Sequence, residues 1–344
     1  MPATFSIFTP VYNDARWLPG AIESVLRQTY PHWELVVGDN ASDRDLGPIV
    51  AGYPDPRIRF QRWERHTGIA DNHNRTILLC RNDWLQILSA DDRLAPDCLE
   101  RMAARIEEAT AAKREPALVI TACRPVFEDG TEAWHAFSGS WRLKRLSSGT
   151  YAPAEWLRHV AEPGQVPWNV GSVALARRVW EVMGGFFREE VGLSIDIDMV
   201  LRASAYGPVE YLEDELLDYT VRPGGINKEL SRSDRASRRL TTLGAALLSG
   251  LAVHEARRLV SPAERKFVER QVAGTFVGRA LQQRYLPGGR GRRGALADLR
   301  RAFNWDLLWF LSRRHAVRAA LAVGAPRTVI VRAKDRFTRT SRVL

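Results

Sequence analysis

Two adjacent carboxylates, Asp91 and Asp92, directly follow an apolar run from Trp84 to Leu88 and the short link Ser89-Ala90. Like charges side by side repel each other, and a divalent cation would remove that repulsion. Hard oxygen ligands suit Mg²⁺ or Mn²⁺ held together with the phosphates of a substrate. An acidic residue here could equally cap the helix expected from Pro96. Taken alone, the pair favours the helix cap.

Other carboxylates stand where expected strands end or helices begin. Asp39 ends the strand expected over 33–38 and could accept hydrogen bonds from a nucleobase or a ribose. An Asx-turn explains Asp39 equally well, and Asp14 has the same ambiguity. Asp196 and Asp198 are two residues apart, so they cannot share one face of a helix. A carboxylate at a helix start in an α/β enzyme is a candidate general base, with capping as the alternative.

Several common kinds of site have no support in the sequence. The seven histidines show no metal-ligand spacing, and there is neither a glycine-rich phosphate loop nor a G-x-S-x-G elbow. Three widely spaced cysteines predict no disulfide framework, which favours a reducing compartment. Most tryptophans are expected in the core, but Trp168 lies in a loop beside Pro167 and could stack on a sugar ring.

The first hundred residues alternate strand-like and helix-like segments. Strands are expected at 4–8, 33–38, 57–60 and 84–88, and helices at 17–26, 68–79 and 96–108. This order predicts an α/β fold with a mostly parallel, doubly wound sheet. Ligands of such sheets lie beyond the carboxyl ends of the strands, where Tyr12, Asp39 and Asp91 fall. Later strands are expected at 118–121 and 133–137, and a loop leading into a strand at 166–173.

The charge of the chain changes beyond residue 225. Residues 226–344 hold 26 Lys and Arg against 8 Asp and Glu, a balance of +18, whereas residues 1–225 have a balance of −8. We expect helices here and a flexible loop at 286–294. The charge could contact anionic lipid, nucleic acid or an acidic partner, or simply be solvated. We therefore predict two parts, 1–225 and a basic helical C-terminal region at 226–344.

The motifs of the front part occur together in one order. They are Pro-x-Tyr-Asn at 10–13, Ser-Val-Leu-x-Gln-Thr-Tyr at 24–30, Trp-Glu-Leu at 33–35, Asp39, Gly68 with Asn72 and Asn74, Asp91-Asp92, Gly-Gly-Phe at 184–186, and Asp196-Ile-Asp198. Over about residues 4–225, this order resembles family-2-type inverting glycosyltransferases with the GT-A fold. The joint pattern is much more specific than any single motif.

The resemblance implies a role for each matched residue. The loop after the first strand and Asp39 would hold the nucleoside, expected to be uridine. Asp91 would bind Mn²⁺ or Mg²⁺ on the donor diphosphate, where the cation offsets developing charge, and Asp92 would lie beside it near the sugar. Asp196 would deprotonate the acceptor hydroxyl on the opposite face of the anomeric carbon, so that the attack inverts the configuration. The predicted donor-binding set is Thr9, Pro10, Tyr12, Asp14, Asp39, Gly68, Asn72, Asp91, Asp92 and Arg222, and the acceptor-binding set is Trp168 and Asp198.

Three positions depart from the family's pattern. Ser89 stands where the first acid of an Asp-x-Asp motif is usual, and Ile195 stands where Glu often precedes the base. Arg222 stands where the family often has a histidine metal ligand in a Tyr-Arg-x-His segment. A guanidinium cannot ligate a metal, but it could pair with the diphosphate.

The expected protein is a hexosyl- or hexosaminyltransferase of polysaccharide biosynthesis at the cell envelope. It has neither the Gln-x-x-Arg-Trp motif of polymerising relatives nor an apolar run of the roughly 20 residues that span a membrane. We expect a cytoplasmic enzyme that acts on a glycan or lipid-linked acceptor. Its basic region could lie peripherally on the anionic inner face of the cell membrane.

Other classes of protein were weighed against this one. A nucleic-acid-binding protein would interleave its arginines with aromatic residues or carry a known module, and neither is present, so no nucleic acid partner is expected. A nucleotidyltransferase would have a glycine-rich basic loop after its first strand, unlike the segment at 9–14. An inactive nucleotide-sugar-binding relative stays open because of Ser89 and Arg222.

Overall fold

A computed structural model describes residues 2–134, 146–162, 168–184, 187–188, 191, 194–222, 232–285, 295 and 299, with side chains excepted at 232–242, 275 and 277–285. The chain divides into two compact units. One comprises Met1–Pro223 and Ser249–Val260, and the other comprises Gly224–Leu248 and Ser261–Leu344. The stretch at 249–260 therefore groups with the front unit, which the predicted boundary at 225 did not anticipate.

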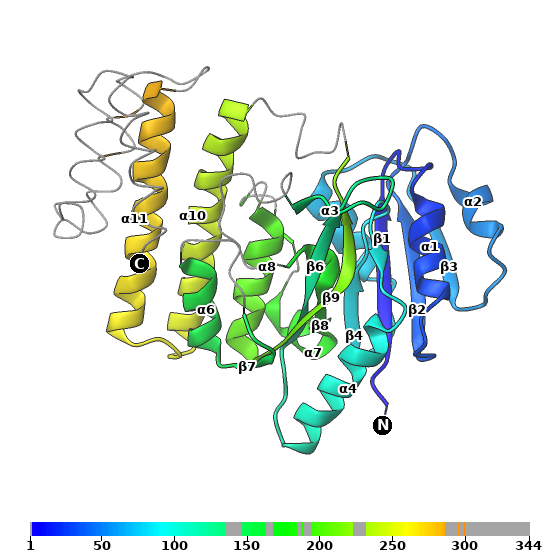
Figure 1. Cartoon of the computed structure of the whole chain (residues 1–344), viewed down its shortest axis with the longest axis horizontal. Helices are drawn as coiled ribbons and strands as arrows, with labels where there is room; N and C mark the ends of the chain where they lie inside the picture. Colours follow the sequence, from blue (N-terminus) through cyan, green and yellow to red (C-terminus); the bar gives the residue numbers. More distant parts are fainter. Residues whose placement is uncertain are drawn as a thin grey trace. The chain divides into compact units, whose positions relative to one another are not determined.

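A nine-stranded sheet forms the centre of the first unit, in the order β3-β2-β1-β4-β8-β6-β9-β5, with β7 paired to β9 (Figure 1). The strands are β1 Phe5–Val11, β2 Trp33–Asp39, β3 Ile58–Arg62, β4 Trp84–Ile87, β5 Arg93–Leu94, β6 Leu118–Val126, β7 Gly149–Tyr151, β8 Val173–Ala176 and β9 Val209–Thr220. From β3 to β4 all pairs are parallel, which confirms the doubly wound prediction. Beyond β4 the sheet is mixed, because β8 runs antiparallel to both of its neighbours.

Strands β1, β2 and β4 are almost wholly buried, as expected of parallel strands covered on both faces, whereas the edge strand β3 is only partly buried. Their register aligns Val11 with Asp39 and Asp39 with Arg62. The carboxyl ends of β1, β2 and β3 therefore meet at one edge of the sheet.

Helices cover both faces of this sheet. They are α1 Leu18–Leu26, α2 Gly47–Ala51, α3 Ile69–Ile77, α4 Cys98–Ala111, α6 Pro153–Ala161, α7 Arg177–Met183 and α8 Ile195–Ala203. In Figure 1, α1 lies in front of the parallel strands and α3 behind them. The approach of α3 to β2 is so close that a Cβ on Gly38 would overlap the side chain of Thr76. A glycine is required there for packing rather than for its conformational freedom.

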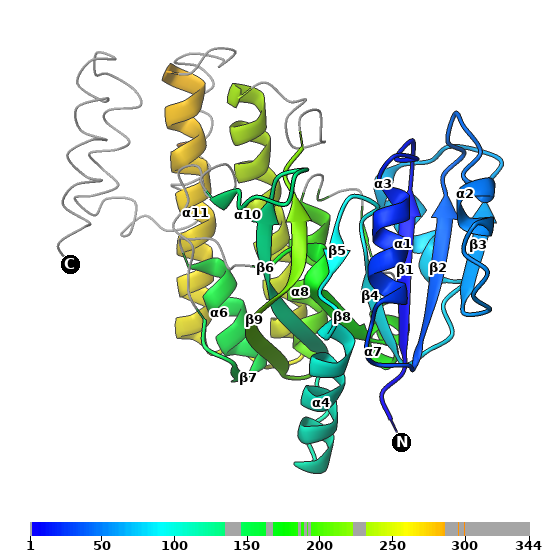
Figure 2. The same ribbon diagram turned by 45° about the vertical axis from the view of Figure 1, so that its right-hand side comes forward.

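After β4 the chain crosses to the other half of the sheet. The two residues of β5 pair antiparallel with β9, with Arg93 opposite Asp218 (Figure 2). The turn at 88–92 is thereby brought to the carboxyl end of β9. This crossing joins segments far apart in the sequence.

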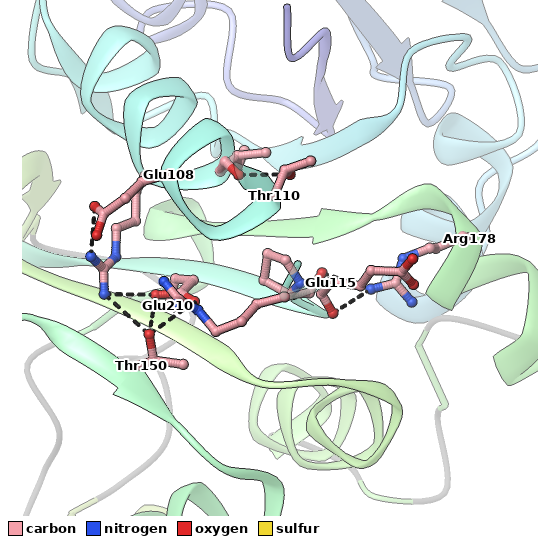
Figure 3. Close-up of polar contacts among 10 residues, drawn as sticks. Glu108, Thr110, Glu115, Thr150, Arg178 and Glu210 are labelled. Atoms are coloured by element: carbon pink, nitrogen blue, oxygen red, sulfur yellow. Dashed lines mark hydrogen bonds and ion pairs between the residues drawn. The ribbon is translucent and has the colours of Figure 1, made fainter. Parts of the chain in front are cut away.

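A buried polar cluster anchors the other end of β9. Glu210 is fully buried, and Arg105 Nη2 lies 2.7 Å and Arg114 Nε 3.3 Å from its carboxylate oxygens. Thr150 on β7 donates to the same carboxylate at 2.8 Å (Figure 3). Buried carboxylates are tolerated when they are paired and hydrogen-bonded in this way.

The second unit contains most of α10 Arg232–Ala256 and all of α11 Pro262–Tyr285, in agreement with the helices expected there. Among the described residues, no helix has the length and apolar character needed to cross a membrane. The predicted loop at 286–294 lies outside the described residues. The strand predicted at 133–137 is wrong at Ala133 and Trp134, which are not in a strand, and its remainder lies outside the described residues.

Candidate functional site

The loops after β1 and β2 are clamped to each other. Asn13 N–H donates to Ser42 Oγ at 2.9 Å, and Asn13 Nδ2 donates to Asp43 Oδ2 at 3.0 Å. Asp43 N–H donates back to Asn13 Oδ1 at 2.8 Å. Asn13 has a φ of +58°, a conformation that asparagine adopts more readily than most residues. Beside it, Tyr12 is 41% exposed, and its ring centroid lies 4.2 Å from that of His66.

Asp39 is fully buried where β2 ends. Ser42 N–H donates to Asp39 Oδ1 at 2.9 Å, and Arg62 Nη1 donates to Asp39 Oδ2 at 2.5 Å. Both carboxylate oxygens are thus engaged within the protein. The side chain of Arg62 is 35% exposed, so it is the part of the pair that solvent reaches. The predicted contact between Asp39 and a nucleoside stays a prediction.

Arg222, two residues beyond β9, joins the loops after β1 and β4. Its Nη1 donates to Asp14 Oδ1 at 2.7 Å, and its Nε lies 2.7 Å from Asp91 Oδ2. The second contact is a short ion pair between the buried Nε and the Asp91 carboxylate. The guanidinium carbon also lies 5.5 Å from the ring centroid of Trp17. Arg222 therefore pairs with both carboxylates, Asp14 and Asp91.

The adjacent carboxylates Asp91 and Asp92 have different surroundings. Asp92 is buried, and its Oδ1 accepts Thr220 N–H at 2.9 Å, which ties the turn to β9. Burial, and then the Asp91 charge, raise the pKa of Asp92 well above its usual range. Burial also raises the pKa of Asp91, against the lowering effect of Arg222. The helix-cap alternative is wrong, because α4 begins at Cys98 without a side-chain cap and Asp92 binds Thr220 instead.

Helix α3 begins next to the loop that follows β2. Gly68 is its N-cap, in an extended conformation, and Asn72 is buried with an Oδ1 that has no hydrogen-bond partner. Asn40, directly after β2, accepts hydrogen bonds on Oδ1 from Thr67 N–H at 3.0 Å and from Arg75 Nη2 at 2.8 Å. Within β1, Thr9 is buried and Pro10 is partly buried. The donor-binding residues predicted on β1, β2 and α3 thus lie on elements that meet at one sheet edge.

The two carboxylates of α8 are also unlike each other. Asp196 is half-buried in the first turn, and its Oδ1 accepts Ile197 N–H at 2.8 Å. Asp198 is fully buried between two arginines, with Oδ1 2.6 Å from Arg188 Nη2 and Oδ2 2.8 Å from Arg202 Nε. The structure corrects the prediction that Asp198 binds an acceptor, because its oxygens are committed to these two side chains.

Trp168 requires a second correction. Its side chain is only 8% exposed and packs in the hydrophobic core. A ring that stacks on a sugar must present an open face, and this one does not. In the described part, Trp168 and Asn169 precede a 3-10 helix at Val170–Ser172, and a loop position by itself says nothing about the direction of a side chain.

The contacts above show which side chains could ligate a divalent metal. No group of three or more His, Cys, Asp or Glu side chains in the described part of the chain could hold a metal ion. A cation of the Mg²⁺ type is usually held by one or two carboxylates plus substrate phosphates, so it needs fewer protein ligands than a site built from side chains alone. The partly exposed Asp91 carboxylate, next to the unpartnered Oδ2 of Asp92, meets that smaller need.

Several residues of the site were missed from the sequence. Arg62 belongs to no motif of the sequence, and its ion pair with Asp39 follows from the register of β3 against β2. Asn40 and Arg75 were missed because their bonds join a loop to a helix. In the sequence, Asn74 stands out only as part of a motif.

Carboxylates and a guanidinium meet at the carboxyl edge of the parallel strands, which is where open α/β sheets bind their ligands. Comparison with known proteins identifies the class of protein. Residues 6–167 match the model of glycosyl transferase family 2. This part of the chain belongs to that family, and it is a glycosyltransferase domain with the GT-A fold.

One curated relative is the succinoglycan biosynthesis protein ExoO of Rhizobium meliloti, which is 38% identical over 100 residues, 29% of each chain. The matched stretches cover 65%, 21% and 29% of three such relatives, less than two thirds in each case. Among solved structures, S. aureus TarS 1–349 in complex with UDP-GlcNAc has a TM-score of 0.57 at 14% identity, covering 88% of this chain and 90% of that one. A mannosyltransferase from Pyrobaculum calidifontis in complex with GDP-Man and Mn²⁺ has a TM-score of 0.50 at 16% identity, covering 94% and 88%. At these identities the likeness establishes the fold.

Proposed function

We propose that this chain transfers a hexosyl or hexosaminyl residue from a nucleoside diphosphate sugar to a hydroxyl of a glycan or lipid-linked acceptor, with inversion. The observation that carries the proposal is the arrangement of Arg222 between Asp14 and Asp91. The three side chains are partly exposed, and a guanidinium at the ligand-binding edge of the sheet is suited to bind an anion such as a diphosphate. Relatives named for surface-glycan biosynthesis support the same chemistry.

The donor would lie along the edge formed by β1, β2, β4 and β9. The nucleoside would occupy the end near Tyr12 and the Asp39–Arg62 pair, where an aromatic face and an exposed guanidinium are available. The diphosphate would lie at Arg222. Uridine is the expected nucleoside, and the GDP-Man complex of one structural neighbour makes guanosine the alternative.

A divalent cation would be held by Asp91 together with the diphosphate. When bound, Mn²⁺ or Mg²⁺ acts as a Lewis acid that stabilises the departing nucleoside diphosphate. Arg222 would donate hydrogen bonds to the same phosphate oxygens, and charge-assisted bonds of this kind are stronger than neutral ones. Asp92 would hold the turn against β9 and so keep Asp91 in place.

Asp196 would be the general base. Its place in the first turn of α8 keeps it partly accessible, unlike Asp198 two residues later. The carboxylate would take the proton of the acceptor hydroxyl as oxygen attacks the anomeric carbon, and the bond to the diphosphate breaks on the opposite side. General-base catalysis typically contributes about 10²–10⁴ in rate.

The basic C-terminal region supports a further part of the proposal. Its balance of +18 would attract an anionic membrane surface and bring the enzyme to a lipid-linked acceptor. Sedimentation of the full chain with vesicles of phosphatidylglycerol and of phosphatidylcholine tests this. Equal binding to both would contradict it.

The binding experiment for the whole proposal is isothermal titration of the full chain with UDP, GDP and their sugars, with Mn²⁺ and with EDTA. We expect one nucleoside diphosphate to bind at micromolar concentration and to protect the fold against heat. If no member of the panel binds under either condition, the proposed function is wrong.

A further inference from the structure

The segment between α7 and α8 is held by one side chain of α3. Asn74 Nδ2 donates to the Phe187 carbonyl at 2.9 Å, and Phe187 N–H donates to Asn74 Oδ1 at 3.0 Å. The residues are 113 positions apart in the chain. The side-chain amide of Asn74 thus pairs with the backbone of Phe187 as two residues on neighbouring antiparallel strands pair. It donates one hydrogen bond and accepts one.

The neighbours of both residues reinforce this contact. The ring of His73 lies edge-on to the Phe187 ring, with centroids 4.7 Å apart. Burial lowers the pKa of His73 to about 4, so the ring is neutral at physiological pH and packs as an uncharged aromatic. Phe187 is itself 3% exposed. Two consecutive side chains of α3, His73 and Asn74, therefore contact Phe187.

The next residue along the chain is bound to α8. Arg188 makes a two-point contact with Asp198, Nε to Oδ2 at 3.1 Å and Nη2 to Oδ1 at 2.6 Å. Asp198 lies two residues after Asp196 on the same helix, and Arg202 holds it from one turn further on. Residues 187 and 188 thus form a direct mechanical link from α3 to the first turns of α8.

We infer that Asn74 is a positioning residue for the reaction: through Phe187 and Arg188 it holds the start of α8, and with it Asp196, relative to the nucleotide end of the sheet. The inference rests on the proposed function, in which Asp196 is the base. Helix α3 is suited to this task because it packs on β1 and β2 and carries Asn72 and Arg75 at the edge where the donor would bind. A base misplaced by about 1 Å can lose on the order of 10² in rate.

The chemistry of the contact supplies a precise variant. Asn74→Asp keeps the shape of the side chain and the acceptor for Phe187 N–H. It places a carboxylate oxygen instead of an N–H against the Phe187 carbonyl oxygen, so one attractive contact becomes repulsive. The matched control is Asn82→Asp. Asn82 Nδ2 also donates to a backbone carbonyl, that of Phe5 at 2.7 Å, but at the amino end of β1 and β4.

Three measurements on the full chain test the inference. In hydrogen–deuterium exchange, N74D should speed exchange of amides at 195–203 by about tenfold or more, and N82D should leave them unchanged. By titration with UDP or GDP, N74D should change affinity less than about twofold. The rate of nucleotide release from the corresponding nucleotide sugar should fall about tenfold or more in N74D only.

The outcomes separate this inference from the proposed function. If N74D exchanges at 195–203 as the wild type does, or slows turnover no more than N82D, the positioning role is wrong. If N74D loosens α8 and loses nucleotide affinity to the same degree as turnover, Asn74 supports the fold in general and the inference also fails. If no nucleotide binds the wild type, the proposed function fails first, and the exchange data still decide whether Asn74 holds α8.

Discussion

Arg222 Nε lies 2.7 Å from Asp91 Oδ2, so the carboxylate best suited to a metal already has a cation beside it. The guanidinium and a divalent ion would compete for the same oxygen. A diphosphate changes this competition, because it offers Arg222 an alternative anionic partner. Metal and nucleotide should therefore bind with positive coupling through Arg222, and by linkage each should raise the affinity of the other equally.

Replacing Arg222 tests that competition. Arg222→Gln should raise the affinity for Mn²⁺ in the absence of nucleotide by about 2–5-fold, the range expected when a partly exposed ion pair is removed. The same change should weaken UDP or GDP binding and reduce the coupling between metal and nucleotide. Calorimetric titration of each ligand with and without the other measures all four sides of the cycle. Arg124→Gln is the control, because Arg124 on β6 also forms a partly exposed ion pair, with Asp218 on β9. Equal Mn²⁺ affinity in the wild type and R222Q would contradict the competition.

Asp196→Asn should separate binding from chemistry. The amide keeps the size of the side chain but cannot accept the acceptor's proton, so turnover should fall by about 10²-fold or more. Nucleotide affinity should remain within about twofold. Turnover is measured as nucleotide release, and Asp214→Asn, which removes a charge paired with Arg101, is the control. Near-normal turnover in D196N would exclude Asp196 as the base. A wild type that binds nucleotide sugars but turns none over would favour the inactive relative.

Asp198 should make stability depend on pH. Burial opposes ionisation of this carboxyl, but Arg188 and Arg202 together outweigh it and lower its pKa below the ordinary value. A depressed folded-state pKa gives stability that is present above the unfolded-state pKa and lost as pH falls through the folded-state value. Asp198→Asn should therefore destabilise the protein by about 3–5 kcal/mol at pH 7, because it leaves two arginines uncompensated. Denaturant unfolding should show a gap between wild type and D198N that is constant from pH 7 to about pH 4 and narrows below that. A gap independent of pH would refute the assignment.

Gly38 offers a test of packing. Gly38→Ala should destabilise the first unit by about 1–3 kcal/mol, because the added methyl group overlaps Thr76 on α3. Thr76→Ala removes the two atoms that the methyl would meet most closely, so the double variant should recover part of the loss. The non-additive energy of the double-mutant cycle is read from denaturant midpoints. Strictly additive effects would show that α3 moves away instead.

The front of the fold could be predicted because its local signals agree with its tertiary structure. The apolar runs that became β1, β2 and β4 are flanked by turn residues, and both features indicate strands. By contrast, β9 was missed, since Glu210, Glu213 and Asp214 lower its apparent strand character. Glu210 is stabilised by Arg105 and Arg114, which are distant in sequence, so no local pattern reports that pairing.

Some residues of the candidate site can likewise be predicted from the sequence, and others cannot. Asp91, Asp92 and Arg222 could be selected by type and motif, and the differing surroundings of the two acids were partly foreseen. Which carboxylate is buried depends on the antiparallel pairing of β5 with β9, and a two-residue strand has no sequence signature. Arg62 and Asn74 make their contacts through strand register and helix packing, which only the three-dimensional structure provides.

The bond between Arg222 and Asp14 spans 208 positions of the chain, and that between Thr220 and Asp92 spans 128. During synthesis, strands β1 to β4 can pair as soon as they emerge, because they need only one another. The contacts of Arg222 with Asp14 and Asp91 cannot form until β9 and Arg222 have been synthesised. A nascent chain that stops before residue 209 lacks Arg222, so Asp14 and Asp91 do not yet have this countercharge. The ion pairs of Arg222 with Asp14 and Asp91 can therefore form only late in folding, and contacts of such long sequence separation form slowly.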